Sequence, residues 1–479
     1  MRSLLLAALV ALPAAALAQR STLTSADSAL VGRILLAEDR RDASDGALAD
    51  GLRHPDTRIR VLAQRARGRI ADSGFAARNS LPALPAPTVW PEAAWQLRFR
   101  ALTAQRANCG ALQTALSDMT WAVRLRAADL LDASCAADEP IVATLRGWID
   151  ALPVHASNRA ADGVSWHAAA HALVALARLH PADARAPTAK LATHEQWQVR
   201  MYAARAAAAL SDTATLRTLA RDADDNVKEA AIGGLSKLAG HTDDAVFIAA
   251  LSATGAQAVR AAAIALKGSP RSDARAAASA AFDRWVARQN APARDARVAL
   301  LEAAGRPASE DRPPPVRSEL PPRAVALALG SDVRLRVTLS PASGGGSFVV
   351  RLRGDVAPMM AARVLALARA GYYDGLAWHR VEPDFLIQGG GPGANEFIGL
   401  PQFFRDELGT VPHVRGTVGM STRGHDTGDA QWFVNLRDNL RLNGEYSLFG
   451  EIVEGIGVAD GILEGDTIAS IAELRAGRE

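Results

Sequence analysis

Residues 378–390 read WHRVEPDFLIQGG and bring a guanidinium, apolar side chains and an amide into one short segment. Arg380 offers rigid hydrogen-bond donors that stay charged at any ordinary pH. Phe385 and Leu386 supply an apolar wall, and the Gln388 amide can both donate and accept. Together these groups are suited to binding a peptide bond and the side chain next to it. No nucleophile, metal-ligand cluster or phosphate-binding loop in the sequence competes with them.

This segment closely resembles the signature of the cyclophilins, in which a strand reading FHR is followed by a hydrophobic turn and by a strand ending in QGG. Three further blocks stand in the family's order: GDVAPMMAARVLALARAGYYDG at 354–375, GTVGMSTRGHDTGDAQWFVN at 416–435 and LNGEYSLFGEIVEG at 442–455. The resemblance covers only the last third of the chain. It implies a mainly-β, eight-stranded barrel with capping helices, and peptidylprolyl cis–trans isomerase (rotamase) activity that needs no cofactor.

The implied reaction is rotation about an Xaa-Pro bond. Uncatalysed rotation takes tens to hundreds of seconds, because amide resonance must be lost at a barrier of about 18–20 kcal/mol. A catalyst needs no covalent chemistry and has only to favour the twisted amide over both planar forms. Arg380 matches the catalytic arginine of the family, which implies that it donates to the proline nitrogen as that nitrogen gains a lone pair. Gln388 matches the amide that binds the substrate carbonyl and orients the arginine.

The resemblance also implies a substrate-binding pocket around Arg380. Its expected members are Phe385, Leu386, Phe433 and Leu442 as an apolar cup for the proline ring, Gln431 beside the cup, Tyr446 at its rim, and Thr422, near which backbone groups hold the substrate's main chain. Leu386 stands where Met is usual, a volume-conserving change, and Arg441 stands where many members carry Trp, which predicts weak cyclosporin binding. Considered singly, the apolar residues could be plain core, the glutamines structural amides, and Arg380 a solvated or ion-paired strand residue.

The part of the chain before about residue 304 repeats another pattern. A polar turn with Asp is followed by Val or Ile with Arg or Lys, and then by an Ala-rich segment with a helical period. Val199, Val227 and Val259 mark three copies, 28 and 32 residues apart. One helix pair cannot bury its own apolar stripe, so neighbouring pairs must stack. The pattern resembles short bacterial HEAT repeats and predicts an all-α, curved solenoid.

A proline-rich stretch at 305–322 interrupts every periodic pattern and predicts a stiff linker. Beyond it, alternating segments around a run of three glycines predict a β-hairpin, and Pro358 suits the first turn of a helix. We therefore expect a multi-domain protein with a HEAT-like solenoid followed by a cyclophilin-like barrel. The expected ranges are 1–18 for a signal peptide, 19–304 for the helical repeats, 305–322 for the linker and 323–479 for the isomerase domain.

The first residues, MRSLLLAALVALPAAALAQ, combine a basic start, a short apolar run and small residues before Gln19. This pattern predicts a cleaved signal peptide and a periplasmic or secreted protein with no membrane association after cleavage. A buried first helix or a membrane anchor is the alternative, although the run is short for a span. In an oxidising compartment Cys109 and Cys135 could bridge neighbouring helical hairpins; otherwise they are two small buried thiols.

Other candidate sites in the sequence are weak. His167 and His171 lie one helical turn apart, but no third ligand is evident and we expect no metal. The Arg-rich segment 60–69 is flanked by acidic residues, the formal net charge is only +3, and export argues against nucleic acid as a partner.

The sequence thus predicts an exported bacterial isomerase that assists the folding of proline-containing polypeptide clients, as a chaperone does. Its helical repeats would bind those clients or a protein partner. The alternative is a scaffold in which the cyclophilin-like domain only binds proline-containing segments, without catalysis.

Overall fold

A computed structural model describes residues 23–71, 83–152, 165–288, 290–312, 316 and 318–474. Helices fill the described chain up to about residue 304, and an eight-stranded antiparallel sheet follows. The predicted fold class, an all-α part followed by a mainly-β cyclophilin-like part, is confirmed; the HEAT type of the repeats stays a prediction. The predicted signal segment, 1–18, lies outside the described residues. Within the described chain, no helix has the length and apolarity needed to cross a membrane.

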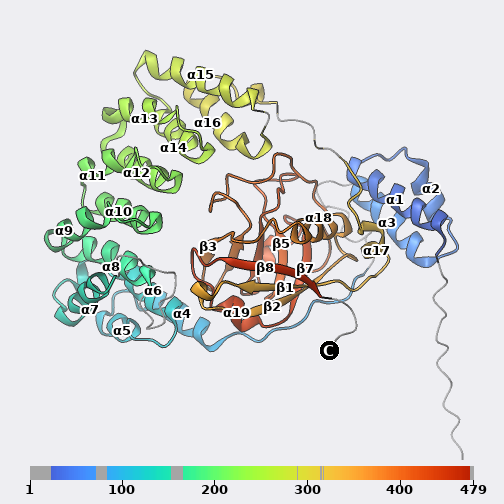
Figure 1. Cartoon of the computed structure of the whole chain (residues 1–479), viewed down its shortest axis with the longest axis horizontal. Helices are drawn as coiled ribbons and strands as arrows, with labels where there is room; N and C mark the ends of the chain where they lie inside the picture. The colour runs from blue at the N-terminus through green and yellow to red at the C-terminus, as the bar shows by residue number, and fades with distance from the viewer. Residues whose placement is uncertain are drawn as a thin grey trace, which may run out of the picture.

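The helices from α4 to α16 form an arc that curves around the barrel (Figure 1). They are α4 Ala94–Ala104, α5 Cys109–Ala115, α6 Trp121–Leu130, α7 Glu139–Asp150, α8 Trp166–Leu179, α9 Pro181–Leu191, α10 Trp197–Ala209, α11 Thr213–Leu219, α12 Asp225–Ala239, α13 Asp244–Ala250, α14 Ala256–Leu266, α15 Ser272–Ala287 and α16 Arg294–Ala304. One continuous hydrophobic cluster runs through all of them. Many of its buried members are alanines, which let neighbouring helices approach closely.

Arginines in the arc reach across to the polar turn that precedes a later helix. Arg98 of α4 donates to Asp118 at 2.7 and 2.9 Å, and Arg200 of α10 donates to Asp222 at 2.8 and 2.9 Å. The same turns also cap helices, since the Asp224 side chain accepts a backbone N–H at the start of α12. The Asp-containing turns that recur in the sequence therefore tie neighbouring helix pairs together.

A disulfide links Cys109 at the start of α5 to Cys135, with an S–S distance of 2.01 Å. Of the two alternatives that the sequence left open, the structure shows the bridge.

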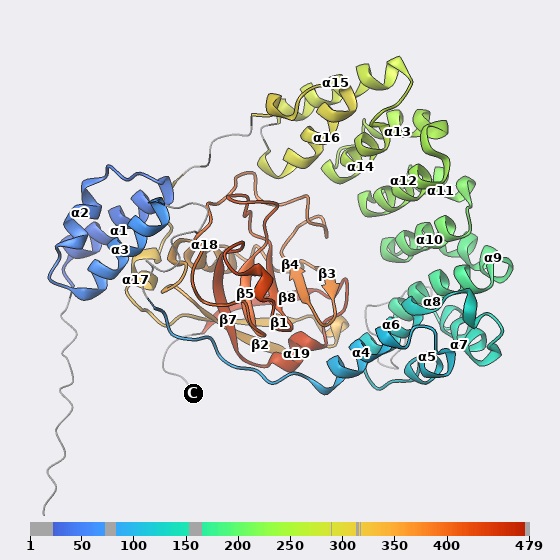
Figure 2. The same ribbon diagram turned by 180° about the vertical axis from the view of Figure 1, so that it is seen from behind.

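The first three helices lie on the opposite side of the barrel from the arc (Figures 1 and 2). They are α1 Ser25–Arg40, α2 Gly46–Leu52 and α3 Thr57–Ala71, and they share one hydrophobic cluster with the barrel and with α17, Ala324–Ala328. A buried carboxylate reinforces this contact. Glu38 of α1 accepts from Arg65 and Arg69 of α3 at 2.8 and 2.5 Å, and Arg69 donates onward to the backbone oxygens of Leu408 and Val356, both at 2.7 Å.

The sheet carries the strands in the order β3-β4-β6-β5-β7-β2-β1-β8. Their bounds are β1 Arg334–Leu339, β2 Ser347–Leu352, β3 Trp378–Glu382, β4 Leu386–Gly389, β5 Thr417–Met420, β6 Trp432–Asn435, β7 Leu448–Glu454 and β8 Ile468–Leu474. The predicted hairpin is β1–β2. A single bridge between Ala377 and Thr467 joins the two ends of the curled sheet. Helices α18, Pro358–Arg369, and α19, Ile456–Asp460, complete the domain.

An extended segment, 83–93, connects α3 to α4 and runs along the barrel (Figure 2). The Trp90 indole donates to the backbone oxygen of Ile452 at 2.9 Å, and Arg415 of the barrel donates to the oxygen of Pro91, also at 2.9 Å.

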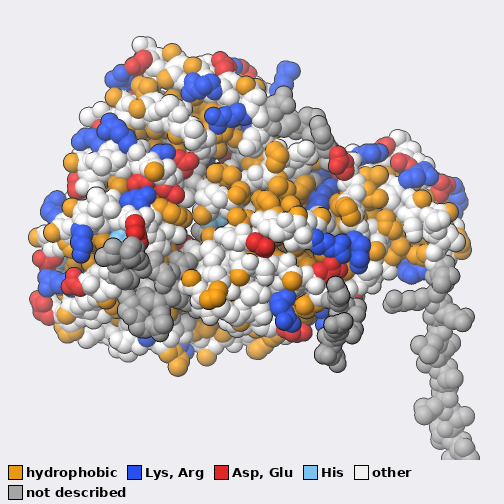
Figure 3. All heavy atoms as spheres, in the orientation of Figure 1, with side chains coloured by type: hydrophobic (Ala, Val, Ile, Leu, Met, Phe, Trp, Pro, Cys, Tyr) orange, Lys and Arg blue, Asp and Glu red, His pale blue; other side chains and the backbone are white. Residues whose placement is uncertain are grey.

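On the face shown in Figure 3, acidic and basic side chains alternate over the arc, whereas hydrophobic side chains gather over the barrel. The helices α1–α3 and the arc flank the barrel on two sides, and the arc faces the edge of the sheet that carries β3 and β4 (Figure 2).

Candidate functional site

Three adjacent strands bring the main candidate side chains together. Arg380 on β3 pairs in register with Gln388 on β4, and Gln388 pairs with Phe433 on β6. Residues directly opposite each other in antiparallel strands project from the same face of the sheet. The sheet therefore aligns the guanidinium, the amide and the phenyl ring in one row across the outside of the barrel.

An apolar cup lies beside this row. Leu386, Phe433 and Leu442 are buried and pack together, with Phe385 and Tyr446 half-buried around them. The rings of Phe433 and Tyr446 meet edge to face at 5.6 Å. The four residues predicted as the cup and Tyr446, predicted at its rim, thus lie in one apolar cluster.

One glycine makes room for the ring at the centre of the cup. A Cβ at Gly419 on β5 would stand 2.5 Å from Cζ of Phe433, which is too close for any real contact. Nothing in the sequence alone marks Gly419 as part of the site, because its role depends on a neighbour from another strand.

A chain of amides holds the arginine. Arg380 donates from Nη1 to Oε1 of Gln388 at 3.3 Å, and Gln388 donates from Nε2 to Oε1 of Gln431, also at 3.3 Å. Gln431 then donates to the backbone oxygens of Ile398 at 2.9 Å and Glu396 at 3.2 Å. Both glutamines are almost fully buried. Each amide is oriented by the next, so the Gln388 carbonyl is fixed towards Arg380.

Arg380 has a second partner that the sequence reasoning missed. It donates from Nε to Oε1 of Glu382 at 2.9 Å, and from Nη2 to the same oxygen. The spacing in the sequence could have predicted this contact, because residues two apart on a strand lie on the same face. The pair is not buried, since the two side chains are 40% and 50% exposed. Arg380 still faces the cup, with Cζ 5.9 Å from the centre of the Phe385 ring.

Thr422 lies on the loop after β5, half-buried. Its neighbour Ser421 donates its backbone N–H to the oxygen of Gln431 at 2.8 Å, so this loop stands next to the amide chain. Arg441, on which the prediction of weak cyclosporin binding rests, lies with Cζ 4.5 Å from the centre of the Phe385 ring. A cation over an aromatic face is attracted by its quadrupole, so Arg441 covers one side of the cup.

The histidines near the site are held by other contacts. Burial lowers the pKa of His379 to about 4, so its ring is neutral at pH 7. His171 contacts Asp129 at 2.7 Å and the Tyr202 hydroxyl at 3.1 Å, while His167 contacts the backbone oxygen of Glu464 at 2.6 Å. Across the described ranges, no three His, Cys, Asp or Glu side chains form a group that could hold a metal ion.

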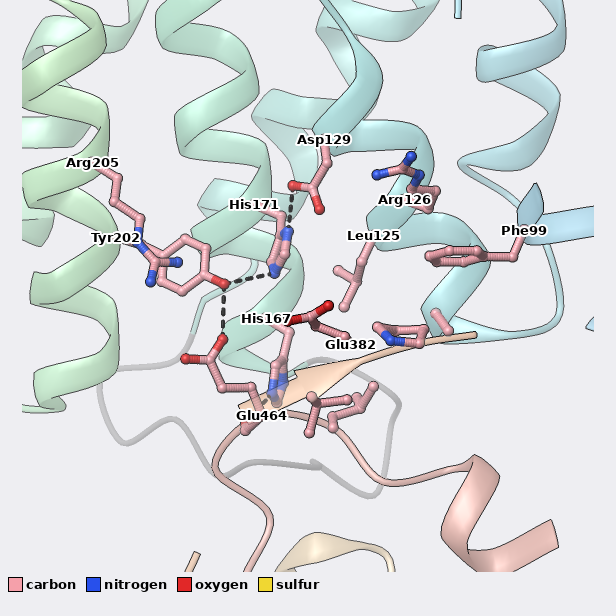
Figure 4. Close-up of a pocket in the computed structure, with 14 residues that line it drawn as sticks. Phe99, Leu125, Arg126, Asp129, His167, His171, Tyr202, Arg205, Glu382 and Glu464 are labelled. Carbon is pink, nitrogen blue, oxygen red and sulfur yellow. Dashed lines mark hydrogen bonds and ion pairs between the residues drawn. The ribbon is translucent and has the colours of Figure 1, made fainter. Parts of the chain in front are cut away.

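Two cavities lie between the arc and the barrel, next to each other along β3, and Arg205 and Glu464 line both. The first, of about 490 Å³, is lined by Arg380 and His379 together with helices α10, α12 and α14. The second, of about 430 Å³, is lined by Glu382 together with α6, α8 and α10. Figure 4 shows this second cavity, where the Tyr202 hydroxyl donates to Glu464 of the barrel at 3.0 Å. The first cavity, which Arg380 lines, therefore lies between the candidate site and the helices of the arc.

Comparisons with known proteins match the C-terminal part of the chain. Residues 336–473 match the family model described as cyclophilin type peptidyl-prolyl cis-trans isomerase/CLD. A peptidyl-prolyl cis-trans isomerase of Helicobacter pylori is 36% identical over 130 residues, which are 26% of this chain and 80% of the relative. A probable peptidyl-prolyl cis-trans isomerase of Brucella suis is 34% identical over 137 residues, 25% of this chain and 68% of the relative.

Among solved structures, a cyclophilin type peptidyl-prolyl cis-trans isomerase of Cryptosporidium parvum is 23% identical. The match covers 31% of this chain and all of that chain, with a TM-score of 0.28.

The fold, the four sequence blocks and the two bacterial relatives lead to one conclusion. Through its C-terminal third, the chain belongs to the cyclophilin-type peptidyl-prolyl cis-trans isomerase family. This domain is that of a peptidyl-prolyl cis-trans isomerase.

Proposed function

We propose that the protein is an exported peptidyl-prolyl cis-trans isomerase that assists the folding of proline-containing polypeptides, with Arg380 as its catalytic donor. The observation that carries this proposal is the row of Arg380, Gln388 and Phe433 on three adjacent strands. It sets a permanently charged donor beside an apolar cup, on a face open to the space between barrel and arc.

Each side chain then has a distinct task. The cup of Phe385, Leu386, Phe433, Leu442 and Tyr446 holds the proline ring, and the loop at Thr422 aligns the polypeptide through its backbone. As the amide twists, the proline nitrogen pyramidalises and becomes an acceptor, which Arg380 can bond only in that state. Gln388 and Gln431 fix the guanidinium in advance, so no reorganisation is needed when the bond turns. Glu382 restrains the other edge of the guanidinium.

Export is supported by the pattern of residues 1–18 and by the Cys109–Cys135 bridge, because disulfides persist mainly in oxidising compartments. A periplasmic or secreted protein fits both. The arc is proposed to bind the client, because its concave side faces β3 and β4 (Figure 2).

The test is a protease-coupled assay on an alanyl-prolyl peptide with the full chain, with Arg380→Ala and, as a control, with Arg334→Ala, which changes a half-exposed strand arginine of β1 away from the site. We expect the wild-type chain and Arg334→Ala to accelerate isomerisation, and Arg380→Ala to lose about 100-fold in kcat/KM, as expected when one transition-state donor is removed. Equal rates for wild type, Arg380→Ala and buffer would refute catalysis. Peptide binding without acceleration would instead favour a non-catalytic scaffold that holds proline-containing segments.

A further inference from the structure

The 490 Å³ cavity beside Arg380 is built from both parts of the molecule. Helices α10, α12 and α14 form one wall, and the loop around Glu396 together with β3 forms the other. Ligand sites are commonly found between domains and have volumes of this order. The cavity is continuous with the candidate active site, since Arg380 itself lines it.

The wall from the arc is rich in acceptors. Glu229 of α12 and Gln257 of α14 both line the cavity, and Gln257 donates from its amide nitrogen to Glu229. Gln257 is only 3% exposed, yet its Oε1 has no hydrogen-bond partner among the described residues. A buried acceptor without a donor is costly, and a ligand that supplies the donor would remove that cost.

The wall from the barrel adds a second carboxylate. Glu396 is half-buried, and its carboxylate forms no ion pair with a lysine, arginine or histidine of the described chain, although Arg423 donates to its backbone oxygen. Its backbone oxygen accepts from Gln431, so it stands next to the amide chain of the site. Burial raises the pKa of Glu229, whereas the hydrogen bond from Gln257 and the charge of Arg260 lower it, and the charge of Glu396 adds a smaller upward shift. Each of the two walls thus carries one glutamate.

The positive groups nearby have other partners. Arg380 is paired with Glu382, and the Arg205 guanidinium lies 4.3 Å from the Tyr202 ring centre, next to Glu464 (Figure 4). Arg260 approaches Glu229, but only to 3.6 Å, and it also stacks on a phenylalanine of the loop. The neutral His379 adds no charge. Arg205 and Arg380 line the cavity and Arg260 pairs with Glu229, but among the described side chains none of these cations forms an ion pair with the Glu396 carboxylate.

We propose that this cavity binds a lysine or arginine side chain of the same polypeptide whose Xaa-Pro bond lies at Arg380. The inference rests on the proposed function, and it names a substrate class, basic segments around proline, that the arc selects. A polypeptide held at Arg380 can place a neighbouring side chain between Glu229 and Glu396, with donors for both carboxylates and for Oε1 of Gln257. A metal ion is less suited, because the described residues offer no group of three ligating side chains.

The experiment measures binding and turnover of short fluorescent peptides that contain one Ala-Pro bond. Lysine or the apolar norleucine is placed at each of three positions on either side of the proline. Wild type is compared with Glu229→Gln and Glu396→Gln, and with Glu139→Gln as a matched control, because Glu139 is an exposed glutamate of the arc outside the cavity. Each variant is first checked for an unchanged melting transition.

At one position or more we expect lysine to improve binding about three- to tenfold over norleucine, the range of a partly exposed ion pair. The ratio of the affinity for the lysine peptide to that for the norleucine peptide should fall towards one in Glu229→Gln and Glu396→Gln. It should keep its wild-type value in Glu139→Gln, and it should decrease in high salt. Equal binding of lysine and norleucine peptides by wild type at all positions would overturn the inference. If lysine is preferred but no peptide is turned over, the proposed catalysis is refuted, whereas the proposed binding site for a basic side chain is supported.

Discussion

Replacing Glu38 by glutamine tests how firmly α1–α3 are joined to the barrel. Glu38, Arg65 and Arg69 are 2%, 4% and 3% exposed, so the change leaves two guanidinia buried with a neutral partner. The introduced amide keeps the shape of the side chain and can still accept one hydrogen bond. What the substitution removes is the charge that balances Arg65 and Arg69.

The expected cost follows from two independent figures. Breaking a buried ion pair by removing one partner costs about 3–5 kcal/mol. Burial alone would raise the pKa of Glu38, but the Arg65 and Arg69 guanidinia lower it from 4.5 to about 2, which corresponds to about 3 kcal/mol in favour of the carboxylate. Glu407, 4.0 Å from Arg69, can compensate in part. We therefore expect a loss near the lower limit, about 3 kcal/mol.

The sign of the pH dependence is set by the lowered pKa. The contribution of Glu38 is complete above its unfolded pKa of about 4.5 and is lost as the pH falls through about 2. Wild type and Glu38→Gln should therefore differ most at pH 6–7 and converge towards about pH 2.

Hydrogen exchange in increasing urea, followed by mass spectrometry, measures the unfolding free energy of peptides from residues 25–71 separately from that of peptides from the arc. The control is Asp50→Asn, which removes an ion pair to Arg53 whose partners are 53% and 74% exposed, and which should cost less than about 1 kcal/mol. If Glu38→Gln costs no more than Asp50→Asn, or only the peptides of α1 respond, the buried network does not join the helices to the barrel.

Three further outcomes follow from other contacts. Burial raises the pKa of Asp429 to about 6, so the stability of the wild type should fall as the pH rises from about 4 through 6. In thermal melting at pH 8, Asp429→Asn should therefore be more stable than the wild type by up to about 3 kcal/mol. Reduction of the Cys109–Cys135 bridge frees a loop with a sequence separation of 26 and should destabilise the arc by about 3–4 kcal/mol, whereas a Cys109→Ser/Cys135→Ser variant should not respond to reductant. Tyr202→Phe removes the hydrogen bond to Glu464 and should speed deuterium exchange of the loop at Glu464 about fivefold; an unchanged rate would mean that this contact does not hold the arc.

The row of Arg380, Gln388 and Phe433 is the part of the site that sequence patterns could predict. Strand periodicity and the ordered blocks are local signals, and antiparallel pairing turns them into a common face. The Arg98–Asp118 and Arg200–Asp222 ties likewise follow from a repeated local pattern. The Arg380–Glu382 pair was available from the same periodicity and was missed.

The rest depends on which apolar faces meet over long separations in sequence. Helices of the two groups, such as α3 and α10, are similarly rich in Ala and Arg, so periodicity does not reveal that α1–α3 share the core of the barrel while α4–α16 form a second cluster. The contact of Gln257 with Glu229, and the position of Glu396 opposite them, exist only because a loop of the barrel meets α12 and α14. No spacing within one segment encodes such a site.

The contacts between arc and barrel limit how a substrate can reach Arg380. Arg100 of α4 is paired with Asp384 at 2.8 Å just before the cup, and Arg423 of the barrel is paired with Asp295 of α16 at 2.9 Å. Tyr202 bonds Glu464 between them. These ties stand at both ends and in the middle of the arc, so arc and barrel together bound the cavities that reach β3. Under the proposed function, an extended chain fits this space better than a folded domain, because a folded domain would have to displace the arc and break these ties.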